Sequence, residues 1–149
     1  ISFVLSLTRA DVTLAGKHPN KLKIAEEQSI KTMNVQDLDI KKDYDVVVEA
    51  TGTVDGFEMA LNLARPRGKI VLKSTVAESK PINLAPLVID EIQLIGSRCG
   101  PFPPALEAMS KQTINVKPLI TGVYKPERFE KAFRRAKNSN SLKVLIDFR

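Results

Sequence analysis

The sequence of 149 residues contains one cysteine, two tyrosines, six phenylalanines and no tryptophan. The single cysteine, Cys99, excludes an internal disulfide and is typical of a protein from a reducing cytoplasm. So few aromatic residues argue against a surface that stacks nucleic-acid bases. No apolar run approaches the length that spans a membrane. We therefore expect a soluble, cytoplasmic protein with neither a nucleic-acid nor a membrane partner.

Basic residues outnumber acidic ones, 23 to 17, which gives a net charge of +6. Because the basic residues are spread over many segments, a solvated basic surface is the default interpretation, and nucleic-acid binding is a minor alternative. The length fits about one domain with one sizeable core.

The most informative segment is DYDVVVEATG, residues 43–52. Its valine run at 46–48 is β-branched and too short for a typical helix, which predicts a parallel strand buried on both faces. Thr51 and Gly52 follow at the carboxyl edge of the sheet, where open α/β folds bind ligands. The alternative is that Gly52 only permits a tight turn.

Helical and strand patterns alternate along the chain, which predicts a doubly wound parallel α/β sheet. After residue 116 the pattern changes to a strand, a helix opened by Pro126 and a final strand, and this tail belongs to a different layer. The expected helices cover the first eight residues, 19–27, 54–64 and the segment after Pro126, and the expected strands cover 11–15, 30–35, 44–50, 69–72, 92–96, 119–124 and 142–148.

The strand at 11–15 would be the second strand of a dinucleotide-binding fold, and Gly16, Lys17 and His18 follow it, with Lys21 one helical turn later. In such folds an acidic residue at this point accepts hydrogen bonds from the adenosine ribose and would repel a 2′-phosphate. A glycine followed by cations instead favours a phosphorylated ribose. The other interpretation is a solvated basic turn.

Six segments in this order resemble the second half of a medium-chain, zinc-type alcohol dehydrogenase, and the resemblance covers essentially the whole chain. They are VTLAGKHPNKL, YDVVVEATG, RPRGKIVL, IQLIGSRCG, VKPLITGVYKPERFEKAF and LKVLIDF. The resemblance implies an NAD(P)-dependent oxidoreductase that moves a hydride between nicotinamide and a small alcohol or carbonyl substrate. It also implies an incomplete Rossmann domain at 1–112 and a C-terminal segment at 113–149 that associates with a GroES-like catalytic domain.

The resemblance also implies which residues contact the cofactor, with NADP expected in preference to NAD. Thr51 and Gly52 would line its passage across the sheet edge, and Ser74 would lie near the nicotinamide. Ser97 and Arg98 would contact the carboxamide. The adenosine end would be surrounded by Gly16, Lys17, His18 and Lys21.

The same resemblance places the glycine-rich phosphate loop and all zinc ligands upstream of Ile1, in the missing N-terminal part. With one histidine and one cysteine, this chain cannot assemble a tetrahedral zinc site, so we expect no catalytic or metal-binding residue in it. Cys99 is interpreted as a small buried residue. We further expect a fragment of a longer enzyme that lacks the first sheet strand, so the strands at 11–15 and 44–50 should not pair directly.

Three alternatives stay open at this point. The chain could come from a zinc-less, quinone-reductase-like enzyme, or it could be a non-catalytic nucleotide-binding or dimerisation module. A methyltransferase that uses S-adenosylmethionine is a weaker candidate, because RPRGKIVL suits it but Gly16 stands where an acidic residue should hold the ribose. The resemblance to the dehydrogenase family also implies a homo-oligomer formed through the edge strand at 92–96.

Overall fold

The strands in the computed structural model run parallel to their neighbours and lie in three sheets. The structure describes residues 1–75 and 80–149. The chain divides into two compact units, one formed by residues 1–38 with 101–149 and the other by residues 39–100.

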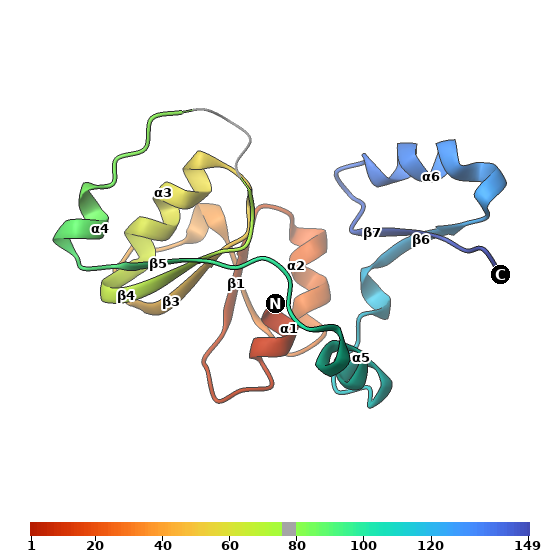
Figure 1. The fold of residues 1–149 in the computed structure, drawn as a ribbon, viewed down its shortest axis with the longest axis horizontal. Helices are drawn as coiled ribbons and strands as arrows, with labels where there is room; N and C mark the ends of the chain where they lie inside the picture. The colour runs from red at the N-terminus through yellow and green to blue at the C-terminus, as the bar shows by residue number, and fades with distance from the viewer. Residues whose placement is uncertain (76–79) are drawn as a thin grey trace. The chain divides into compact units, whose positions relative to one another are not determined.

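The unit of residues 39–100 contains a three-stranded sheet in the order β3-β4-β5. Helix α3 (Val54–Leu63) follows β3 and packs on β3 and β4, as in a parallel crossover connection (Figure 1). The short helix α4 (Ala85–Ile89) precedes β5. The three strands are β3 (Tyr44–Glu49), β4 (Ala64–Leu72) and β5 (Gln93–Gly96).

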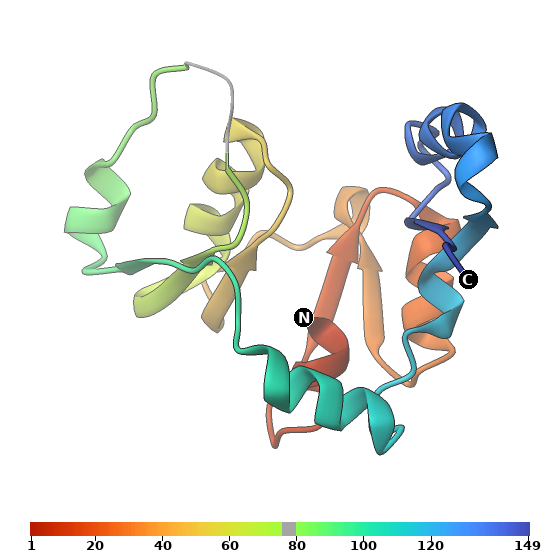
Figure 2. The same ribbon diagram turned by 45° about the vertical axis from the view of Figure 1, so that its right-hand side comes forward.

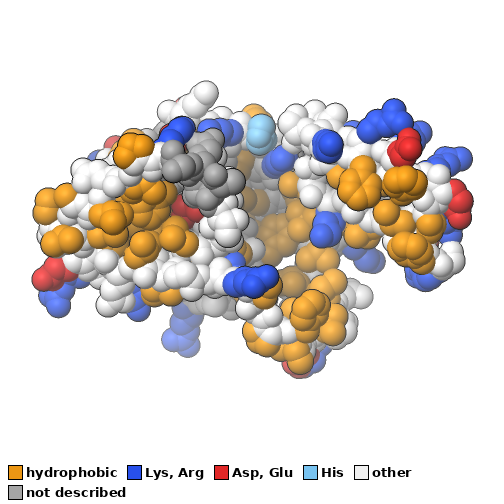
Figure 3. Space-filling model, turned by 45° about the horizontal axis from the view of Figure 1, so that its top comes forward, with side chains coloured by type: hydrophobic (Ala, Val, Ile, Leu, Met, Phe, Trp, Pro, Cys, Tyr) orange, Lys and Arg blue, Asp and Glu red, His pale blue; other side chains and the backbone are white. Residues whose placement is uncertain are grey.

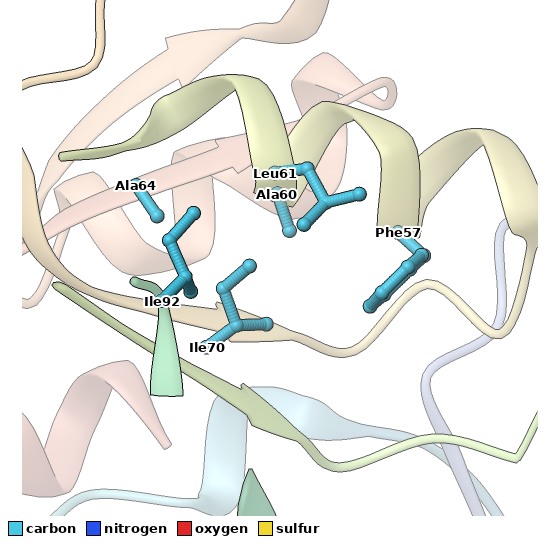
Figure 4. Packing of buried hydrophobic residues seen from close by; sticks show 6 residues of the cluster. All are labelled: Phe57, Ala60, Leu61, Ala64, Ile70 and Ile92. Atoms are coloured by element: carbon cyan, nitrogen blue, oxygen red, sulfur yellow. The ribbon is translucent and has the colours of Figure 1, made fainter. Parts of the chain in front are cut away.

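The core of this unit lies between α3 and the sheet. Phe57 and Leu61 lie four residues apart on one face of α3, and Ile70 of β4, which is 0% exposed, lies beneath them (Figure 4). Burying a side chain of this size contributes roughly 1.5–3 kcal/mol. The stripe predicted at 54–64 is thus the buried face of the helix. The cluster consists of Phe57, Ala60, Leu61, Ala64, Ile70 and Ile92.

Strand β3 is not buried on both faces, so that prediction is wrong. Val47 packs against the core, whereas Val46 is 51% exposed. Successive side chains alternate across a strand, so Val46 points away from α3. The buried side chain at the end of the run is the carboxylate of Glu49, which is only 3% exposed.

Strand β4 begins at Ala64, five residues before the expected start at Lys69. The extra residues form an irregularity, since Tyr44 pairs with Ala64 but Val46 pairs with Lys69. Arg67 has a φ of +62° there, and its N–H donates to the Asp90 carbonyl oxygen at 2.7 Å. A Cβ on Gly68, the next residue, would lie 2.8 Å from the Arg65 carbonyl oxygen, so glycine allows the close backbone approach at this bend.

The other unit contains two separate pairs of parallel strands. The first consists of β1 (Thr13–Gly16) and β2 (Lys31–Asn34), which α2 (Pro19–Glu26) connects and packs against (Figure 2). Leu22 and Ala25 are the buried residues of this helix. The expected strand at 11–15 is therefore shifted, and Gly16 is its last residue. The short helix α1 (Ser2–Leu5) precedes this pair, and the 3-10 helix η1 (Val35–Asp37) follows it.

The second pair consists of β6 and β7, with α6 packed against both strands. Ala132 of α6 is buried, but Phe129 and Phe133 are 53% and 60% exposed, so only part of the predicted apolar stripe is covered. The elements after residue 100 are α5 (Phe102–Ser110), η2 (Lys117–Leu119), β6 (Ile120–Tyr124), η3 (Pro126–Arg128), α6 (Phe129–Ala136) and β7 (Lys143–Ile146).

Helix α5 was not predicted. Pro101, Pro103 and Pro104 interrupt its sequence pattern, yet a first helical turn tolerates proline because its N–H groups have no partner within the helix.

Strands β1 and β3 belong to different sheets. Each is hydrogen-bonded to one strand only, β1 to β2 and β3 to β4, in the part of the chain that the structure describes.

Large apolar side chains are also exposed on both units and form patches (Figure 3). The most exposed are Val88, Ile89, Phe102, Phe133 and Phe148. Among the described residues, no helix is long and apolar enough to cross a membrane.

Candidate functional site

The carboxyl ends of β3, β4 and β5 lie side by side, and five of the predicted cofactor-binding residues follow them. Because parallel strands share their direction, their carboxyl ends form one edge of the sheet, which is where α/β folds bind ligands. Thr51 and Gly52 follow β3, Ser74 follows β4, and Ser97 and Arg98 follow β5. The structure therefore places these five residues at one edge of one sheet.

A residue that the sequence analysis did not select, Glu49, holds three of them together. Its Oε1 accepts hydrogen bonds from the Thr51 N–H at 2.5 Å and the Thr51 hydroxyl at 2.6 Å. The Gly52 N–H is 3.3 Å from the same oxygen and donates at 2.9 Å to the Ser74 hydroxyl oxygen. The Ser74 hydroxyl in turn donates to Glu49 Oε2.

These contacts stabilise the ionised form of Glu49. Burial acts in the opposite direction and on its own would raise the pKa of this carboxyl group. The hydrogen bonds from Ser74, Thr51 and Gly52 outweigh it, and the pKa lies below its ordinary value of 4.5. The edge therefore contains a fixed negative charge at neutral pH, and donors from two strand ends surround it.

The backbone after β3 turns sharply at Gly52, which has a φ of +75°. This left-handed conformation is strained for other residues and is the reason that glycine is required there. The amides of Thr51 and Gly52 both point toward Glu49, so they shape the edge rather than face outward.

The Glu49 network continues into the first turn of α3. Thr53 occupies the N-cap position, and its hydroxyl oxygen accepts from the Gly56 N–H at 3.1 Å. The hydroxyl oxygens of Thr53 and Thr51 are 3.0 Å apart. Since Thr51 donates its only hydroxyl proton to Glu49, Thr53 is the donor in this pair. The helix start is thus tied to the same carboxylate.

Lys73 organises the third part of the edge and was also missed in the sequence. Its ammonium group donates to the Ser97 hydroxyl at 3.3 Å and to the Arg98 carbonyl oxygen. The Ser97 N–H donates to the Leu72 carbonyl oxygen at 2.9 Å, which extends the β4 to β5 pairing by one residue. Both predicted residues are exposed, and Lys73 fixes the backbone that carries them.

The residues predicted for the adenosine end lie together in the other unit. Gly16, Lys17, His18 and Lys21 line a shallow pocket of about 150 Å³ between the end of β1 and the start of α2. Lys17 and His18 are exposed. A Cβ on Gly16 would lie 2.9 Å from Leu22 Cδ2, so glycine allows the helix to pack closely against the strand. The pocket is completed by Leu14, Ala15 and Leu22.

Residues 1–75 and 80–149 contain no group of three or more histidine, cysteine or acidic residues that could hold a metal. Cys99 is exposed rather than buried, which corrects the sequence prediction. It lies in the coil after β5 and not within an element of the core.

Comparisons with known proteins agree with this architecture. Residues 7–113 match the family described as zinc-binding dehydrogenase. The chain is 28% identical to a sorbitol dehydrogenase from Halalkalibacterium halodurans, over 85% of this chain and 41% of the relative. The chain therefore spans less than half the length of this relative.

Solved structures give the same result for the fold. L-Idonate 5-dehydrogenase from Escherichia coli superimposes with a TM-score of 0.87 at 26% identity, over 97% of this chain and 45% of that one. A zinc-binding dehydrogenase from Sinorhizobium meliloti bound to NADP gives 0.85 at 20% identity, over 97% and 47% of the two chains. The predicted Rossmann-like parallel α/β fold is thereby confirmed.

Proposed function

Because the chain belongs to the zinc-binding dehydrogenase family, we propose that it binds a nicotinamide dinucleotide for hydride transfer to or from an alcohol or carbonyl carbon. The bound cofactor supplies the hydride chemistry at its nicotinamide ring. The role of this chain is to bind and orient that cofactor. The observation that carries the proposal is the ordered edge at the ends of β3, β4 and β5, where Glu49 and Lys73 fix five predicted contact residues.

We assign the two ends of the cofactor to the two groups of residues. Thr51 and Gly52 line its path across the sheet edge, and Ser74 lies near the nicotinamide. Ser97 and Arg98 follow β5 and offer polar groups to the carboxamide. The adenosine end is assigned to Gly16, Lys17, His18 and Lys21, which line one pocket.

NADP is the preferred cofactor in this proposal. A 2′-phosphate carries negative charge, and the pocket after β1 has the cations Lys17 and Lys21 where NAD-specific folds place a carboxylate. Structural relatives of this chain were solved with NADP and with NADH bound, so the preference for NADP rests on the two lysines.

We propose a polyhydroxylated substrate, a sugar alcohol or a sugar acid, for the whole protein. Two of the relatives act on sorbitol and L-idonate according to their names. The described residues hold no metal-ligand cluster, so we assign no zinc-dependent step to them and place any zinc in the part of the relatives that this chain does not cover.

We also propose a cytoplasmic homo-oligomer that associates through β5. This strand lies at the edge of its sheet, and Leu94 and Ile95 are each 41% exposed. An edge strand can pair with a copy of itself across a two-fold axis. Residues 113–149 are assigned to contacts with the catalytic domain.

Calorimetric titration of the full-length protein with NADP and with NAD tests the cofactor proposal. We expect both to bind, NADP more tightly. Binding of neither would contradict the function, and tighter binding of NAD would contradict the argument from the cations. Lys17→Glu should weaken binding of NADP more than binding of NAD, because it replaces a cation of the pocket after β1. Lys31→Glu is its matched control, because Lys31 is an exposed lysine at the opposite end of the same strand pair.

A further inference from the structure

Each hydrogen bond that the Glu49 carboxylate accepts comes from a group at the proposed cofactor edge. Glu49 is 3% exposed and receives hydrogen bonds from Thr51, Gly52 and Ser74. Two of these residues follow β3 and the third follows β4. The carboxylate therefore fixes the relative position of two strand ends.

The Ser74 hydroxyl group is polarised by these contacts. A hydroxyl has one proton to donate and two lone pairs that accept. An ionised carboxylate only accepts, so the Ser74 proton is committed to Glu49 Oε2. One lone pair accepts from the Gly52 N–H at 2.9 Å. Among the contacts that the described residues make, one lone pair of Ser74 remains for a ligand.

We propose that Glu49 is a positioning residue that presents the Ser74 hydroxyl to the nicotinamide end of the cofactor as a hydrogen-bond acceptor. This inference rests on the proposed function. The partner is an N–H or O–H donor of the cofactor, and that end of a nicotinamide dinucleotide carries both a carboxamide N–H and ribose hydroxyls.

Replacing Glu49 with glutamine reverses the direction of its hydrogen bond with Ser74 and changes the shape of the side chain little. The amide oxygen can keep the Thr51 contacts, but the amide nitrogen in place of Oε2 donates to Ser74 instead of accepting from it. Ser74 then receives two donors, and its own proton turns outward toward the donor on the cofactor. We expect Glu49→Gln to weaken NADP binding about tenfold, the scale of one lost hydrogen bond.

A double-mutant cycle separates positioning from a general structural effect. Ser74→Ala should weaken NADP binding about tenfold in the wild-type protein and less than about threefold in the Glu49→Gln background, since both substitutions remove the same interaction. The control is Glu58→Gln, which removes an exposed carboxylate from α3 and should change the affinity by less than about twofold.

The pH profile provides a second readout. NADP affinity of the wild type should fall as Glu49 protonates below its ordinary pKa of 4.5, and Glu49→Gln should lack that additional fall. If circular dichroism shows that Glu49→Gln is unfolded, Thr51→Val replaces it. Losing one donor to the carboxylate should move the acid limb of binding to higher pH.

The outcomes are distinguishable. A wild-type protein that binds neither NADP nor NAD refutes the proposed function. A wild type that binds NADP while Glu49→Gln binds equally well, or a cycle in which the two effects add, refutes only the role of Glu49. An unchanged acid limb in Thr51→Val also refutes that role.

Discussion

Replacing Gly56 with alanine should destabilise α3, although the same exchange usually stabilises a helix. In a helix interior, alanine is favoured over glycine by about 0.5–1 kcal/mol. Here an added Cβ would lie 1.9 Å from Thr51 Oγ1 and 2.8 Å from Thr51 Cβ. Heavy atoms cannot approach so closely, so the Thr51 side chain has to move.

The magnitude follows from what Thr51 would lose. Its hydroxyl donates to the buried carboxylate of Glu49 at 2.6 Å, and a hydrogen bond to a charged group contributes roughly 1.5–3 kcal/mol. After the helix-propensity gain is subtracted, we expect Gly56→Ala to lower the local stability of α3 by about 1–2 kcal/mol. The alanine also disturbs the cofactor edge, because Thr51 and Ser74 share the same carboxylate.

Hydrogen exchange measured by mass spectrometry on the full-length protein gives the local opening free energy of α3 without assuming two-state unfolding. Gly100→Ala is the control, since nothing lies within 4 Å of its added Cβ. In the Thr51→Ala background, Gly56→Ala should cost less than in the wild type, because the hydroxyl group that it displaces and the 1.9 Å contact are already absent. Equal or slower exchange of α3 in Gly56→Ala would refute the reasoning.

Three further predictions concern the core, the cations and the buried carboxylate. Ile70→Ala should lower the free energy of unfolding by roughly 2–5 kcal/mol in urea titrations, because its side chain is 0% exposed, whereas Val88→Ala, at 79% exposure, should change it by less than about 0.5 kcal/mol. Lys17→Glu should weaken NADP binding about tenfold and NAD binding far less in calorimetric titrations, and equal losses for both cofactors would contradict the assignment of the phosphate to this pocket. The pKa of Glu49 is lower in the folded protein than its ordinary value of 4.5 in the unfolded chain. Its contribution to the free energy of unfolding is therefore fully present above pH 4.5 and is lost as the pH falls through the pKa of the folded state. The stability difference between wild type and Glu49→Gln in urea titrations should therefore shrink below pH 4.5, and a difference independent of pH would contradict this explanation.

Hydrophobic periodicity was sufficient to predict the elements with clear patterns. The helix at 54–64 was recognised because its apolar residues recur at three- and four-residue spacing, and the structure buries Phe57 and Leu61 as that spacing requires. The parallel pairing of β3, β4 and β5 follows from the alternation of strand and helix. Helix α5 was not predicted, because its prolines interrupt the hydrophobic periodicity that is typical of a helix.

Burial was harder to predict than secondary structure. The valine run at 46–48 is equally apolar along its length, yet only tertiary packing decides which face α3 covers, and Val46 lies on the other face. Cys99 was expected to be buried from its residue type, but its position in a coil leaves it exposed.

The sequence predicted residues of the candidate site that could contact a ligand. It did not indicate Glu49 and Lys73, which hold those residues in place. Glu49 was not selected, because a sequence does not show which donors converge on a carboxylate. One hint was present: an acidic residue directly follows three valines and precedes a threonine and a glycine. Lys73 had no comparable hint, since its contacts with Ser97 and Arg98 bridge 24 and 25 residues.

The bond between Ser74 and Glu49 also has a consequence for the order of folding. It closes a loop of 25 residues, and bringing the ends of such a loop together has an entropic cost that a single hydrogen bond does not offset. We expect the bond to form only after α3 has docked on the sheet through Phe57 and Ile70. The edge proposed to receive the cofactor would then be the last part of its unit to become ordered during folding and the first to be lost on unfolding.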